Sequence, residues 1–150
     1  MEFLSRERIH AIRIDLDKFA SEIDTNIILA LEPVEDKITQ LNSKQLLKSK
    51  GADDGDLINE RTGSPYLSKA YAKRMKKSKP NIFVSGAFQK EMFLQMDNAK
   101  EYFISSYNRL VKYLPGQYLN MFGISKADQP IARQIWKESF RNLSKTKTGL

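Results

Sequence analysis

Apolar residues recur with helical spacing over the first part of the chain. Between residues 5 and 31 they follow one another at intervals of three or four positions: Ile9, Ile12, Leu16, Phe19, Ile23 and Ile27. This spacing places them on one stripe of a helix, with charged and polar residues over the rest of its surface. The pattern predicts an amphipathic helix from about residue 5 to 31.

A second helix is expected from about residue 33 to 49. Pro33 cannot continue the hydrogen bonds of the preceding helix, but it suits the first turn of a new one. Val34, Ile38 and Leu41 give this second helix a weaker apolar stripe. Two helices that meet at a proline form either a hairpin or a kinked rod, and the sequence does not decide between them.

In the middle of the chain, apolar and polar residues alternate with a period of two and no longer follow helical spacing. Asp97-Asn98 suits a tight turn, and residues 100–107 then read as a returning strand. The segment before the turn places four apolar residues on one face, as a half-buried strand requires: Phe88, Met92, Leu94 and Met96. The pattern predicts a β-hairpin, entered at Ser85-Gly86.

Helices are expected on both sides of this hairpin. Residues 66–77 form a short basic helix, which should end at Ser78–Asn81 because proline disfavours helix in the residue before it. Ser125 and Asp128 fit a capping arrangement at the start of a final helix. That helix should end near Lys145, with the remaining residues frayed. Its apolar stripe consists of Ile131, Ile135, Trp136, Phe140 and Leu143.

Together these elements predict an α+β protein. We expect a long N-terminal helical segment, a small antiparallel β-sheet built on a hairpin, and a C-terminal helix packed on it. The 150 residues match the length of one typical domain. Within one structural unit overall, we expect a helical extension over residues 1–50 and an α+β domain over residues 51–150.

Charge is divided unevenly along the chain. Residues 1–60 hold 8 Lys and Arg against 13 Asp and Glu, whereas residues 61–150 hold 17 against 5, giving net charges of −5 and +12. Such a division suits either a nucleic-acid-binding face or head-to-tail contact between identical copies. The sequence leaves both open. The candidate binding residues, which face either DNA or a neighbouring subunit, are Lys69, Lys73, Arg74, Lys76, Lys77 and Lys79.

Signals for catalysis and cofactors are missing from the sequence. It contains no cysteine, and its one histidine, His10, has no second histidine nearby to make a metal site. The acidic segment 51–56 fails as a calcium loop, because Lys50 falls on the first ligand position, and is expected to be a solvated loop. We find no phosphate-binding glycine motif. We therefore expect no catalytic residue, no cofactor and no metal site.

The early chain shows neither a secretory signal nor a membrane span. Its longest apolar run, residues 27–31, has five residues, whereas a membrane helix needs about 20. A soluble protein without membrane contact is expected.

Three short motifs follow one another in the second half of the chain. They are Arg61-Thr62-Gly63-Ser64-Pro65-Tyr66, Val84-Ser85-Gly86-Ala87-Phe88 and Met121-Phe122-Gly123-Ile124-Ser125. Their order over residues 58–145 resembles that in the neck and tail-completion proteins of tailed bacteriophages, which lie between portal and tail. The chain departs from that family's pattern in having Ser85 where threonine is usual, and two N-terminal helices where one would suffice.

The resemblance implies a structural virion protein that forms an oligomeric ring in the neck or tail-completion region. Such a ring joins the portal and head to the tail around the DNA channel. The implied partners are other copies of the chain, portal or other neck proteins, tail proteins and packaged DNA. The chain would be assembled in the host cytoplasm and would reside in the virion. The alternative is a small basic nucleic-acid-binding or regulatory protein that uses residues 69–79, and a third possibility is an unrecognised enzyme.

Overall fold

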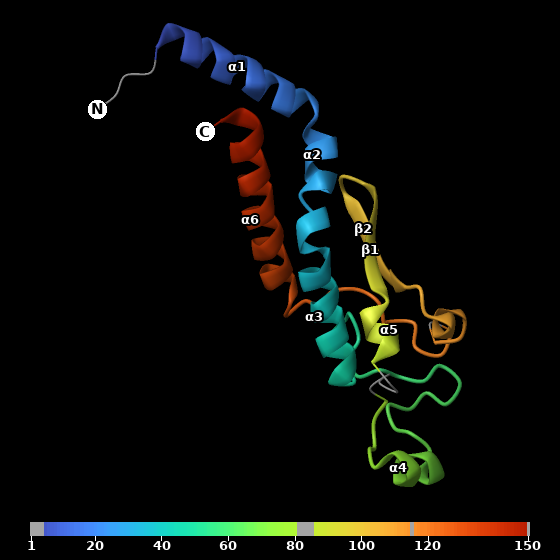
Figure 1. Cartoon of the computed structure of the whole chain (residues 1–150). Helices are drawn as coiled ribbons and strands as arrows, with labels where there is room; N and C mark the ends of the chain where they lie inside the picture. Colours follow the sequence, from blue (N-terminus) through green and yellow to red (C-terminus); the bar gives the residue numbers. More distant parts are fainter. Residues whose placement is uncertain (1–4, 81–85, 115, 150) are drawn as a thin grey trace.

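The computed structural model describes residues 5–80, 86–114 and 116–149 (Figure 1). The predicted α+β class is confirmed. Of the hairpin entry predicted at Ser85-Gly86, Ser85 lies outside the described residues. The helices are α1 (Arg6–Ser21), α2 (Ile23–Leu29), α3 (Glu35–Leu47), α4 (Lys69–Met75), α5 (Ala87–Lys90) and α6 (Gln129–Thr148), and the antiparallel strands are β1 (Met92–Asn98) and β2 (Glu101–Ser106).

The N-terminal helices form a kinked rod rather than a hairpin (Figure 1). The helix predicted over residues 5–31 is present but is broken at Glu22, and a 3-10 turn over Glu32–Val34 leads into α3. Buried Asn26 holds the break: its side-chain amide donates to the Phe19 carbonyl at 3.1 Å, and its oxygen accepts from Lys147 Nζ at 2.6 Å. The bend between α1 and α2 is therefore fixed by hydrogen bonds.

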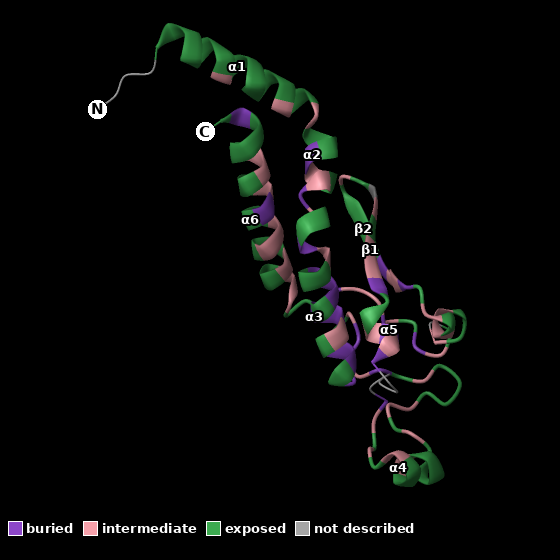
Figure 2. Cartoon of the chain, viewed as in Figure 1, coloured by how far each residue is buried: buried purple, intermediate pink, exposed green. Residues whose placement is uncertain are grey.

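Helix α3 lies at the centre of the hydrophobic core, between the hairpin and α6 (Figure 1). Figure 2 shows the buried residues gathered along α3 and the lower part of the hairpin. The core therefore includes residues from both sides of residue 50, as expected of one structural unit overall. The core residues are Val34, Ile38, Leu41, Leu46, Leu57, Phe88, Met92, Ile104, Tyr118, Met121 and Ile124.

The predicted hairpin is present, with Met92 opposite Ser106 and Met96 opposite Tyr102. Its first strand begins later than predicted. Phe88 lies in the helical turn α5, which follows Gly86 at a φ of +77°. Because one helical turn also returns a side chain to the same side, buried Phe88 still shares the core with Met92.

The hairpin turn also lies later in the chain than predicted. The turn residues are Ala99 and Lys100, not Asp97 and Asn98. The side-chain oxygen of Asn98 accepts from the backbone N–H groups of Lys100 and Glu101, at 2.8 and 3.0 Å. This Asx-type arrangement fixes the turn after Asn98, and the strand register shifts between Met96 and Asn98 to accommodate it.

Helix α6 runs further than predicted. Instead of ending near Lys145 it continues to Thr148, which is buried, and Gly149 closes it in the left-handed conformation. Lys147 Nζ lies 3.7 Å from the Glu22 carboxylate, so the last turn is attached to the bend of the rod. At the other end, Ser125 Oγ accepts from the Asp128 N–H at 3.2 Å, but this bond closes the turn before the helix. Helix α6 begins at Gln129, and its N-cap residue is Asp128, which makes no side-chain cap bond, so Ser125 is not the N-cap that was predicted.

Two buried amides on α3 hold the connection that leads into α6. Asn42 donates to the carbonyls of Met121 and Gly123 at 3.0 and 2.9 Å. Gln45 donates to the Gly123 carbonyl at 3.1 Å and accepts from the Ser125 N–H at 3.0 Å. Gly123 has a φ of +121° and lies so close to Ala52 that a Cβ there would be 3.0 Å from that side chain. We call Asn42 and Gln45 the amide clamp.

The clamp generates a prediction about stability. Asn42→Ala leaves the Met121 carbonyl without its side-chain donor and removes one of the two donors to the Gly123 carbonyl. The free energy of unfolding should fall by about 1–3 kcal/mol, because unsatisfied buried polar groups are costly. Gln40→Ala, at an exposed position of the same helix, is the matched control and should change stability little. Denaturant unfolding followed by circular dichroism measures both variants. Equal stabilities for the two would show that the clamp contributes nothing.

Candidate functional site

The predicted basic cluster lies on and after α4, which projects from the end of the molecule opposite α1 (Figure 1). Lys69, Lys73 and Arg74 are exposed on the helix. The helix ends at Met75 and Lys76 adopts the left-handed conformation, so Lys76 and Lys77 lie outside the helix that was predicted over residues 66–77. We call residues 69–77 the basic knob.

One member of the predicted cluster is held by the body of the protein. Lys79 Nζ lies 2.6 Å from one oxygen of Asp56, and Lys50 Nζ lies 2.9 Å from the other. Hydrogen bonds from Lys79 and then Lys50 lower the pKa of the Asp56 carboxyl, and Asp56 in turn raises the pKa of Lys79. Lys79 therefore anchors the segment after α4. Lys77 is half-buried, and the exposed part of the cluster consists of Lys69, Lys73, Arg74 and Lys76.

The acidic loop is fastened to the fold, contrary to the expectation of a plain solvated loop. Besides the Asp56 ion pairs, Asp53 accepts from the Asn120 side chain at 2.8 Å, and Asp54 accepts from the Ala127 N–H at 3.3 Å. A Cβ on Gly51 would collide with Asn120, at 2.2 Å from its side-chain nitrogen. These carboxylates thus attach the loop to residues 120–127.

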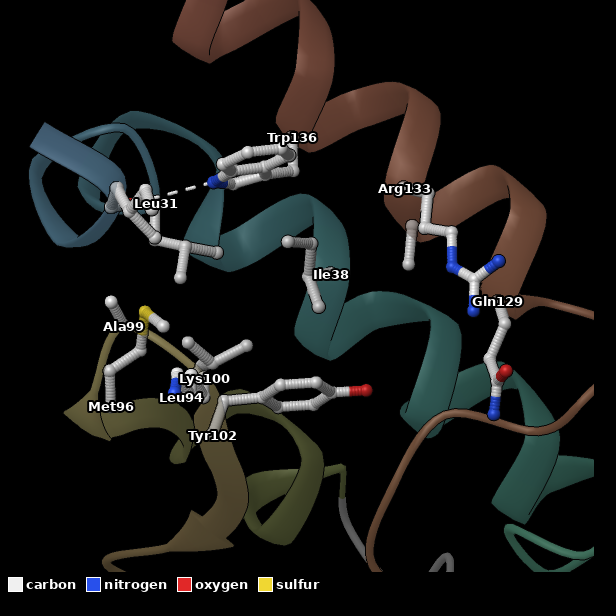
Figure 3. Close-up of a pocket in the computed structure, with 12 residues that line it drawn as sticks. Leu31, Ile38, Leu94, Met96, Ala99, Lys100, Tyr102, Gln129, Arg133 and Trp136 are labelled. Carbon is white, nitrogen blue, oxygen red and sulfur yellow. Dashed lines mark hydrogen bonds between the residues drawn. The ribbon is translucent and has the colours of Figure 1, made fainter. Parts of the chain in front are cut away.

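A groove of about 460 Å³ opens between the hairpin, the rod and α6 (Figure 3). Trp136 stands on one wall, with its ring nitrogen donating to the Ile27 carbonyl at 3.4 Å. Two cationic side chains, Lys100 from the hairpin turn and Arg133 from α6, line the groove, and neither has an ion pair within the described chain. The remaining lining is mostly apolar: Ile27, Leu31, Ile38, Leu94, Met96, Ala99, Tyr102, Gln129 and Ala132.

The groove was not evident from the sequence. Alternation correctly predicted that Leu94 and Met96 share a face, and helical spacing grouped Trp136 with the stripe of α6. Neither pattern shows that the hairpin and α6 leave a space between them. Lys100 and Arg133 become neighbours of this space only through the tertiary fold.

A second apolar surface lies on the helical arm, by which we mean α1 and α2 (residues 6–29). Figure 2 shows α1 exposed along most of its length. The ring of Phe19 packs edge-on against Phe140 of α6, with 5.7 Å between ring centres. The other edge of the stripe is uncovered: Ile9, Leu16 and Ile23, seven residues apart, are 53%, 42% and 40% exposed. We call these three residues the open stripe.

The outer face of the hairpin carries exposed aromatic residues. Phe93 stacks on Tyr107 with ring centres 4.3 Å apart and meets Phe103 edge-on at 6.5 Å. Phe103 and Tyr107 remain exposed to solvent. The sheet has only two strands in the described chain, so its outer strand edges have no strand partner there. Exposed backbone edges of this kind can pair with another chain.

Within residues 5–80, 86–114 and 116–149, no group of three or more His, Cys, Asp and Glu side chains is arranged to hold a metal ion. The same residues include no helix with the length and apolarity needed to cross a membrane. His10 is exposed on α1. The surfaces that distinguish the described structure are therefore the knob, the groove, the open stripe and the aromatic face.

The basic knob generates a prediction about nucleic acid. Any binding of the chain to duplex DNA should be lost when Lys73, Arg74, Lys76 and Lys77 are all replaced by Gln, and the salt dependence should have a log–log slope of about −0.9 per neutralised phosphate. The control replaces four exposed basic residues elsewhere, Lys126, Lys137, Arg141 and Lys145, and keeps the same net charge. Fluorescence anisotropy of a labelled duplex measures DNA binding by the knob variant and by the control variant. Unchanged binding by the knob variant would exclude the knob as a DNA-binding site.

Comparison with known proteins gives no relative for this chain. No family model matches it, and neither a curated protein nor a solved structure is significantly similar to it. What the chain does must therefore be inferred from its own surfaces.

Proposed function

We propose that this chain is a structural protein of a tailed bacteriophage, which assembles with copies of itself into a ring in the neck or tail-completion region. The observation that carries the proposal is the open stripe. Ile9 and Leu16 lie one heptad apart on α1, and Ile23 follows the break at Glu22 as the first residue of α2. Exposed apolar residues at heptad spacing on a helix normally insert between the side chains of a facing helix. In the described chain α6 covers only the Phe19 side of this stripe.

Exposed apolar surface supports assembly because contiguous patches of this kind are uncommon on proteins that act as monomers. The open stripe is one such surface, and the aromatic face of the hairpin is another. They lie on different elements, α1–α2 and β1–β2, so a contact between copies can join unlike surfaces. Contacts of that heterologous kind close into rings when the rotation between neighbours allows it.

The division of charge supports the same arrangement. The net charges of −5 over residues 1–60 and +12 over residues 61–150 favour contact between the first part of one copy and the second part of the next. The exposed lysines of the knob are then left to face a DNA channel or a neighbouring protein. Portal, other neck proteins and tail proteins would be the outer partners of such a ring in the virion.

The alternative is a small basic nucleic-acid-binding protein. The exposed position of Lys69, Lys73 and Arg74 on a projecting helix favours it. It leaves the open stripe without a role, however, because phosphate contacts need cations and not an uncovered row of isoleucine and leucine. We therefore prefer assembly, and the knob variant described above tests the alternative.

Assembly is tested on the full chain by analytical ultracentrifugation and electron microscopy. We expect closed rings that dissociate into monomers when Ile9, Leu16 and Ile23 are all replaced by Glu, since charged residues cannot be buried without cost. Ile14→Glu is the control, because Ile14 is 54% exposed on the opposite side of α1, and this variant should still form rings. A wild-type chain that stays monomeric at every concentration would contradict the proposal.

A further inference from the structure

We propose that the acidic half of the arm, residues 15–24 of one copy, docks in the groove of the next copy, between its hairpin and α6. This inference rests on the proposed self-assembly and specifies which surfaces meet. The partner for each surface is thus another copy of the same chain.

The two surfaces match in polarity. The groove is lined mainly by apolar side chains, among them Ile, Leu, Met and Trp, and has a volume of about 460 Å³. Leu16 and Ile23 are exposed on the arm, one on each side of the break at Glu22. Placing them against Leu94, Met96 and Trp136 would remove apolar surface from water on both sides.

The two surfaces also match in charge. Arg133 and Lys100 line the groove without an ion-pair partner in the described chain. Asp15, Asp17 and Asp24 flank Leu16 and Ile23 on the arm, and all three are exposed. In the docked arrangement, the carboxylates beside Leu16 and Ile23 would meet the cations at the edge of the groove. These charge pairs would determine both the partner and the register of the contact.

The contact must be between copies because the chain does not make it with itself. The lining residues of the groove come from the hairpin, from α6 and from the rod from Ile27 onward, and none of them lies in residues 15–24. Figure 1 shows α1 bending away at the break and passing the C-terminal end of α6. Residues 15–24 and the groove of one copy can therefore contact different neighbours, which is the heterologous geometry that a ring requires.

Engineered disulfides test this contact, because the chain has no cysteine of its own. The Leu16→Cys and Ala99→Cys variants are purified separately, mixed and oxidised mildly. Each variant oxidised alone gives the background amount of disulfide-linked dimer. We expect a disulfide-linked dimer from the mixture, since a bond forms only when the two Cα atoms lie within about 7 Å. In the control, Ile14→Cys replaces Leu16→Cys in the mixture, and the amount of disulfide-linked dimer should not exceed the background.

Charge reversal gives a second measurement on the same assembly. Arg133→Glu should weaken association about fivefold, and Asp17→Arg in the same chain should restore most of it if the two residues face each other across the contact. Circular dichroism confirms that both variants fold.

The outcomes separate this inference from the proposed function. The chain could form rings without giving the Leu16–Ala99 crosslink, or crosslink equally well through Ile14. Either result would contradict docking of the arm in the groove but would leave the ring proposal intact. A chain that never associates would overturn both. A crosslink specific to Leu16, together with restoration by Asp17→Arg, would establish that the arm occupies the groove.

Discussion

The arrangement of this chain depends on the amide clamp formed by Asn42 and Gln45. The same helix that fills the core with Ile38, Leu41 and Leu46 also turns these two amides toward the carbonyls and the N–H group of residues 121–125. Those residues lead directly into α6. Because a buried carbonyl without a donor is costly, the clamp determines where the last helix starts and which side of α3 it follows.

The clamp also explains why the molecule has a groove. The hairpin is attached to α3 on one side, and α6 is attached through residues 121–125 and through Lys147 at the bend of the rod. The hairpin and α6 are thus held separately, and the space between the hairpin and the first turns of α6 is left open. The part of the arm before Glu22 extends past this small core. Phe19 packs against Phe140 there, whereas Ile9 and Leu16 stay exposed. A small core with long helices leaves apolar surface that a second chain can cover.

Local patterns predicted the elements well, and tertiary contacts decided the rest. The spacing of Ile9, Ile12 and Leu16 predicted the first helix, but the break at Glu22 depends on Asn26 bonding to Phe19 and Lys147, a residue distant in sequence. The hairpin was predicted from alternation, yet its turn followed the side chain of Asn98. In the basic cluster, composition could not separate Lys79, which pairs with Asp56, from the exposed lysines of α4. The groove involves three segments distant in sequence, which no local pattern brings together.

The central claim is that the arm is completed by another copy of the chain. Hydrogen exchange of residues 6–29, followed by mass spectrometry over a series of protein concentrations, tests it most directly. Amides of helices that lack packing open easily, whereas those of packed helices are protected. The account predicts rapid exchange of the arm in dilute protein and strong protection once copies associate, with α3 protected throughout. Exchange of the arm that does not change with concentration would contradict it.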